Sequence, residues 1–211
     1  MLLSFSDSLV IVPAQIAIIQ INIKSLIVMR LPRILMLLAG ILMMSLFIWP
    51  MWKITLLAPQ YPDGVQMHIH INKIGGSTHG TLQNVNILNH YIGMKTIPKP
   101  EEMWEFSAFP KVIGAMVFLG VLTGFLGFIG KVSYKWFIGW FLLMSILGVL
   151  GMYDFNAWMI DYGTNLDPHA IMKMANPDGT PMTYKPPLFG HANMLNFQVT
   201  SLPQTGAWMM F

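Results

Sequence analysis

Cysteine is absent from the 211-residue chain, and charged side chains make up only 10% of it. Without thiols the protein has no disulfides and no thiolate metal ligands, and it has no cysteine nucleophile. Twelve lysines and arginines against nine carboxylates leave a net charge of +3. These cations are scattered and form no basic cluster, so we reject a nucleic-acid partner.

The chain also lacks the short motifs of common enzyme classes. It contains no glycine-rich phosphate loop, no Gly-X-Ser-X-Gly elbow, no His-Glu-X-X-His motif and no Cys-X-X-Cys-His haem attachment. Glu101, Glu102 and Glu105 lie at the start of a predicted helix, where carboxylates ordinarily compensate the helix dipole. We therefore expect no enzyme, no catalytic residue and no small-molecule substrate.

Apolar sequence is abundant instead, at 55% of the residues. Residues 34–52, 110–130 and 136–153 are each long and apolar enough to cross a bilayer as a helix. A short basic turn joins the last two, so 110–153 is a predicted transmembrane hairpin. No Asp, Glu, His or Arg lies inside a span, which argues against a transporter or proton pump. The fold class is an integral membrane protein, mainly α.

Glycines recur along the hairpin and are expected to let helices pack closely, either within the hairpin or against a partner. They are Gly120, Gly124, Gly127, Gly130, Gly139, Gly148 and Gly151.

The basic residues predict the orientation. Arg30 and Arg33 precede the first span, and Lys131 and Lys135 flank the hairpin turn, so these sides are expected to be cytoplasmic. The N-terminal segment 1–33 is then inside a bacterial inner membrane, and the loop 53–109 and the tail 154–211 face the periplasm. Most of the carboxylates lie in this loop and tail.

The two ends of the sequence each lead to a separate prediction. Residues 1–28 are apolar but interrupted by Pro13, Gln15 and Lys24, whereas Met29 opens a run typical of a natural start of translation. We expect residues 1–28 to be a non-native extension, with a fourth span as the alternative. The final run, Thr-Gly-Ala-Trp-Met-Met-Phe, is typical of a helix start, so a further helix is expected beyond it.

The loop 53–109 is predicted to be a small mixed α/β domain. Residues 65–74 alternate as a strand that ends in a Gly75–Gly76 turn, with His68 and His70 on one face and Met67, Ile69 and Ile71 on the other. A helix from Leu82 ends at Gly93, and residues 98–106 predict a second short helix. The tail, rich in proline, is predicted to be irregular, with one short helix at 168–175.

Metal ligands in this chain must come from histidine and methionine. His90 and Met94, His169 and Met172, and His191 and Met194 are each three or four residues apart, although Gly93 would break the first pair if it were helical. Imidazole and thioether together suit copper, especially Cu(I). The competing interpretation is flexible packing by methionine and solvated histidine. The predicted copper ligands are His68, His70, His90 and Met94, followed by His169 and Met172.

Two segments carry a resemblance to a known group of proteins. Leu-Ala-Pro-Gln-Tyr-Pro-Asp-Gly at 57–64 and Asn-Val-Asn-Ile-Leu-Asn-His-Tyr-Ile-Gly-Met-Lys-Thr-Ile at 84–97 resemble uncharacterised bacterial membrane proteins encoded near nitrous oxide reductase maturation genes, including that of the NosL-type copper chaperone. The resemblance covers roughly residues 29–110. It implies a role in copper supply to an exported metalloenzyme or in its assembly.

The sequence therefore predicts a membrane-anchored accessory protein that binds copper or assists copper-enzyme maturation, with a membrane or periplasmic protein partner. Its alternatives are a structural subunit of a membrane respiratory complex and, third, an electron carrier that binds haem non-covalently through His and Met.

Overall fold

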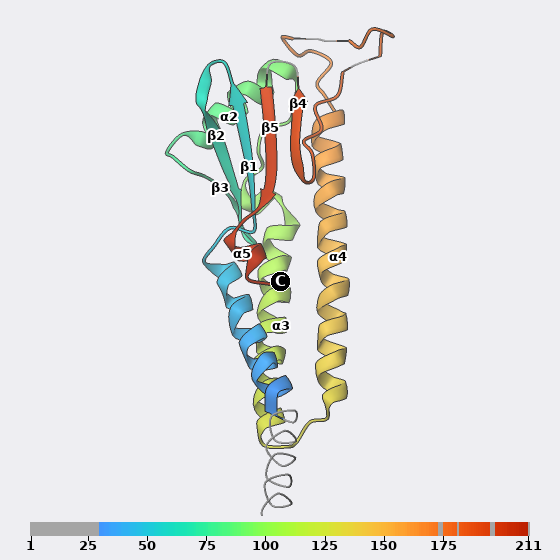
Figure 1. Ribbon diagram of the computed structural model, residues 1–211. Helices are drawn as coiled ribbons and strands as arrows, with labels where there is room; N and C mark the ends of the chain where they lie inside the picture. Colours follow the sequence, from blue (N-terminus) through green and yellow to red (C-terminus); the bar gives the residue numbers. More distant parts are fainter. Residues whose placement is uncertain (1–29, 173–174, 181, 195–196, 211) are drawn as a thin grey trace, which may run out of the picture.

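The computed structural model describes residues 30–172, 175–180, 182–194 and 197–210. In this part of the chain a bundle of three long apolar helices continues into a five-stranded sheet with a helix on one face (Figure 1). We call these two regions the helical part and the sheet domain. The fold is mixed α/β, and the three helices are long and apolar enough to cross a membrane. The predicted extension 1–28 lies outside the described residues.

The helices differ in their bounds from the predicted spans. The first runs over Arg30–Phe47 and ends in a 3₁₀ turn, η1 (Met44–Phe47), because the chain then enters strand β1 (Trp52–Ala58). The second, α3 (Trp104–Phe128), begins before the predicted residue 110 and holds Pro110 in its interior. A helix that crosses a membrane tolerates such a proline when its neighbours satisfy the freed backbone groups.

The third helix, α4 (Tyr134–Thr164), continues well beyond the predicted end at residue 153. Its upper turns keep a helical apolar face: Phe155 and Met159 pack against the core of the sheet, and Tyr162 lies one turn further on. A single helix therefore belongs to both the helical part and the sheet domain.

Three of the predicted glycines make close helix contacts. A Cβ on Gly120 would lie 3.0 Å from the Trp140 ring of α4, one on Gly124 would lie 2.8 Å from Leu37 of the first helix, and one on Gly127 would lie 2.8 Å from Phe137. Trp140 Nε1 also donates to the carbonyl of Met116 at 2.9 Å, which fixes α4 against α3. No atom lies within 4 Å of a Cβ built on Gly130, Gly139, Gly148 or Gly151 in the part of the chain that the structure describes.

The sheet contains β2 (Tyr61–Ile69), β3 (Ile74–Gly76), β4 (Gly190–Met194) and β5 (Phe197–Pro203) besides β1, in the antiparallel order β3-β2-β1-β5-β4. The tail is therefore not irregular, since it supplies β4 and β5. The helix predicted at 168–175 is absent from the described residues of that range, which form turns, bends and a bridge. The segment 53–109 and the tail thus build one sheet.

The elements around β2 match the predicted elements in part. The strand starts earlier than predicted and ends at Ile69, so Gly75 and Gly76 lie in β3 rather than in a turn. Helix α2 (Thr81–Ile92) is confirmed, with Gly93 as a left-handed cap at φ 79°. The second short helix is only a 3₁₀ turn, η2 (Pro100–Glu102), directly before α3, and the chain's final helix, α5 (Thr205–Trp208), is short.

Trp52, Ile54, Met159 and Val199 form the centre of the core between the sheet and α4. The Trp52 ring lies edge-on to Phe155 at 5.6 Å, and its Nε1 donates to Ser201 Oγ at 2.7 Å. Met67 and Ile69 pack against this core, as the alternation of β2 predicted. The core therefore joins residues from both halves of the chain.

A substitution at Gly163 tests whether the backbone of the tail packs directly against α4. A Cβ there would lie 2.3 Å from the Lys185 Cα, a backbone atom that cannot move aside. We expect Gly163→Ala to cost about 2 kcal/mol and lower the Tm by about 4–8 °C in a thermal unfolding scan. The matched control Gly148→Ala, on the same helix with open space around it, should keep the wild-type Tm or raise it slightly, because alanine favours a helix over glycine. Equal Tm values for the two variants would contradict this packing.

Candidate functional site

The first two predicted ligands lie at the end of β2 and just beyond it. His68 is opposite Lys53 on β1 and Gly75 on β3, on the sheet face away from the core. The backbone N–H of His70 donates to the carbonyl of Lys73 at 2.9 Å. A Cβ on Gly75 would lie 4.0 Å from His70 Nε2, so this glycine lies next to the His70 imidazole.

The surroundings of both imidazoles favour their neutral form. Partial burial and then the Lys53 charge lower the pKa of His68. Partial burial, Lys73 and His68 lower the pKa of His70. A neutral imidazole has a free nitrogen lone pair, which metal ligation requires. Because the lysines repel a metal in proportion to its charge, the pair suits a monovalent ion better than a divalent one.

The predicted pair His90 and Met94 is separated by the end of α2. His90 is exposed on the last turn of that helix, whereas Met94 follows the Gly93 cap and its side chain faces the interior. The Met94 N–H donates to the carbonyl of Asn89 at 2.9 Å, which closes the helix end. The two side chains therefore do not share a helix face, as the position of Gly93 suggested.

His169 and Met172 lie in the segment that follows α4 and docks on the end of α2. The Asp167 N–H donates to the Gly93 carbonyl at 2.8 Å, and the Met172 N–H donates to the Tyr91 carbonyl at 2.9 Å. His169 Nδ1 lies 3.3 Å from Asp167 Oδ1, and its side chain is 90% exposed. The hydrogen bond from the His169 backbone N–H lowers the pKa of Asp167, with smaller contributions from the imidazoles of His169 and His90.

The six predicted ligands therefore do not meet in one place. The described residues contain no group of three or more His, Cys, Asp or Glu side chains arranged to hold a metal ion. His191 and Met194 lie three residues apart on a strand, which puts them on opposite faces, and His191 Nδ1 lies 2.7 Å from Thr200 Oγ1.

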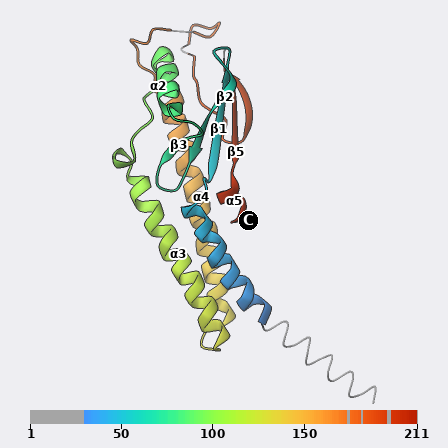
Figure 2. The ribbon, with the colours of Figure 1, turned by 90° about the vertical axis from the view of Figure 1, so that its left-hand side faces the viewer.

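A second feature of the sheet domain escaped the sequence analysis. A cavity of about 80 Å³ lies between the inner face of the sheet, α2 and the upper turns of α4, whose arrangement is visible in Figure 2. Its lining includes four methionines, four aromatic side chains and no charged side chain among the described residues: Met67, Met94, Met159, Met194, Trp158, Tyr162, Tyr184 and Phe197. The alternation of β2 placed Met67 inward, but the tail fold that brings Met159 and Met194 beside it was not predicted.

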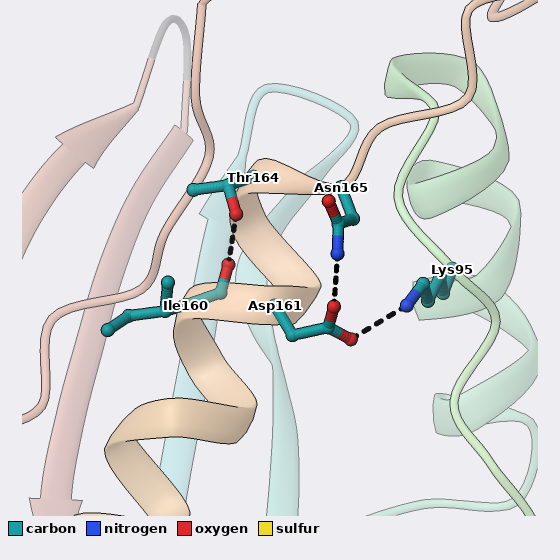
Figure 3. A network of polar contacts seen from close by, with 5 residues as sticks. All are labelled: Lys95, Ile160, Asp161, Thr164 and Asn165. Atoms are coloured by element: carbon teal, nitrogen blue, oxygen red, sulfur yellow. Dashed lines mark hydrogen bonds and ion pairs between the residues drawn. The ribbon is translucent and has the colours of Figure 1, made fainter.

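Polar contacts hold the wall of this cavity near Met94. Lys95 Nζ lies 2.7 Å from Asp161 Oδ2 of α4, and Asn165 Nδ2 donates to the other carboxylate oxygen (Figure 3). Asn89 Nδ2 donates to the Lys95 carbonyl at 3.0 Å and to Tyr162 Oη at 3.4 Å. Because Lys95 follows Met94 directly, these bonds fix the chain beside that methionine.

No family model, no curated protein and no solved structure matches this chain. The histidine pair and the cavity are the features of the structure that bear on function.

The titration of His68 tests the electrostatics of the pair. Its pKa in the folded protein lies below the ordinary 6.5, so protonation opposes folding as the pH falls below that value. Lys53→Gln removes the facing cation and should move the His68 titration to higher pH, followed by NMR of the imidazole C–H groups. Lys99→Gln serves as the control because Lys99 does not contribute to the shift of His68. An unmoved His68 titration in Lys53→Gln would disprove the contact.

Proposed function

We propose that this chain is a membrane-anchored copper-binding protein whose sheet domain faces the periplasm and assists the maturation of a copper enzyme. The observation that carries the proposal is the pair of imidazoles of His68 and His70, which lie beside Gly75 in surroundings that favour their neutral form. Imidazole is a good copper ligand in either oxidation state. Two ligands leave coordination positions open, which favours capture and release of the ion over permanent storage.

The arrangement of the helices supports the predicted orientation. A Cβ on Gly127 would lie 3.4 Å from Arg33 Cγ, so the basic start of the first helix lies beside the basic turn between α3 and α4. The sheet domain is at the opposite end of the bundle (Figure 1). Under the positive-inside tendency, the paired basic ends face the cytoplasm and the histidines face the periplasm.

The natural absence of cysteine makes the orientation directly testable. Ser77 in the sheet domain and Ser133 in the α3–α4 turn are both exposed. We expect Ser77→Cys in intact spheroplasts to react with a maleimide that cannot cross the membrane, and Ser133→Cys to react only after the membrane is permeabilised. Labelling in the reverse order would place the sheet domain in the cytoplasm and end the periplasmic proposal.

Copper binding is tested with the detergent-purified chain. Anaerobic Cu(I) competition against a chromogenic chelator should show binding that His68→Gln/His70→Gln weakens by about tenfold or more, equivalent to about 1.4 kcal/mol. The control is His79→Gln/His191→Gln, which removes the same number of exposed imidazoles elsewhere. Equal affinities of the two double variants would remove the histidine pair from the proposal.

A structural subunit of a larger membrane complex is the second candidate. Its support is the outer face of α4, where Phe141, Val149 and Tyr153 are 65%, 69% and 73% exposed. Both lipid and a partner helix fit such a face. A chain that binds no copper and co-purifies with a large complex would favour this candidate.

A further inference from the structure

The cavity behind the sheet gathers soft ligands from four separate elements. Met67 comes from β2, Met159 from α4 and Met194 from the end of β4, while Met94 follows α2. Met159 is only 1% exposed and belongs to the core, and Met67 and Met194 pack against that core. Three of the thioethers therefore belong to one packed cluster, and the fourth lies at the same cavity.

Ordinary packing does not explain the space that remains among these side chains. Methionine is flexible and usually fills irregular gaps, so four of them around one gap are expected to close it. The cavity nevertheless keeps about 80 Å³. This is well above the roughly 10–15 Å³ that one water-sized occupant needs. The cavity is therefore large enough to hold an ion.

The chemistry of the lining selects the ion. The described part of the lining supplies neither imidazole nor carboxylate, the ligands by which zinc, calcium and magnesium are usually held, and its polar side chains are Asn89, Tyr162 and Tyr184. Thioether sulfur is a soft ligand that suits Cu(I). The rings of Trp158 and Tyr162 also line the cavity and stack on each other with their centres 4.6 Å apart.

We propose that the cavity is a Cu(I) site with the thioethers of Met67, Met94, Met159 and Met194 as its ligands. The inference rests on the proposed copper function and deepens it, because it adds a second, buried site that is selective for the reduced ion. The histidine pair is on the opposite face of the sheet, so each site can be removed without touching the other.

The test uses the full chain in detergent and exchanges methionine for leucine, which nearly conserves volume. The cavity variant is Met67→Leu/Met159→Leu/Met194→Leu. The control is Met36→Leu/Met43→Leu/Met116→Leu, three buried methionines of the helical part with exposures of 5%, 3% and 4%. Both triple variants are titrated anaerobically with Cu(I), and with Ag(I) as a redox-inert probe, against a competing chelator.

Wild type and the control are expected to bind one more equivalent of Cu(I) and Ag(I) than the cavity variant. That difference should persist in the His68→Gln/His70→Gln background. Equal stoichiometry and affinity in the cavity variant and the control would overturn the cavity site while leaving the histidine site intact. Loss of all Cu(I) from the histidine variant would likewise overturn the cavity site and support the histidine pair. Absence of Cu(I) binding by wild type would end both proposals.

Single exchanges keep the test decisive if the triple cavity variant does not fold. Met94→Leu and Met194→Leu affect partly exposed side chains at the cavity, where a volume-conserving change costs little stability. Each should weaken Ag(I) affinity by about tenfold or more, or about 1.4 kcal/mol. Affinities equal to those of Met116→Leu would overturn the site.

Discussion

The contacts of Trp52 hold the sheet domain to the helices. Its ring packs against Phe155 of α4 at 5.6 Å and against Phe189 of the tail at 4.8 Å. Its Nε1 donates to Ser201 Oγ, which in turn donates to the Leu188 carbonyl at 3.1 Å. A side chain at the start of β1, shortly after the first helix ends, thus binds the top of α4 and the last strand at once. The buried polar pair has a full set of partners, so it orients the core without leaving an unsatisfied group.

The two faces of the sheet carry different kinds of side chain. Because side chains alternate along β2, Met67 faces the methionine cavity and its neighbour His68 faces outward. His68 is therefore partly accessible from solvent, whereas Met67 packs against the core. Two adjacent residues thus place an imidazole and a thioether on opposite faces of one domain.

The sequence predicted the long helices and α2 correctly, because the pattern that defines each of them lies within a short stretch of the chain. Three apolar runs, the helical spacing from Leu82 to Tyr91 and the glycine after α2 gave the long helices and α2. The strands of the tail were missed because β4 is only five residues long and β5 derives its stability from pairing with β1, far away in the sequence. For the same reason the cavity was invisible, since Met194 reaches Met67 through the strand pairing and Met159 through the packing of α4 on the sheet. The His–Met pairs of the predicted ligand set were built from spacing within helices, and His169 and Met172 prove to lie in no helix.

The pairing of β1 with β5 also determines when the domain can be completed during biosynthesis. Trp52 opposes Pro203, and the whole of α3 and α4 lies between them in the chain. On a translating ribosome, β1 emerges long before its partner, so one edge of that strand stays unpaired while both long helices are synthesised. Such an edge is a template for wrong pairing. A chain that stalled after α4 would leave this edge of β1 without its native partner.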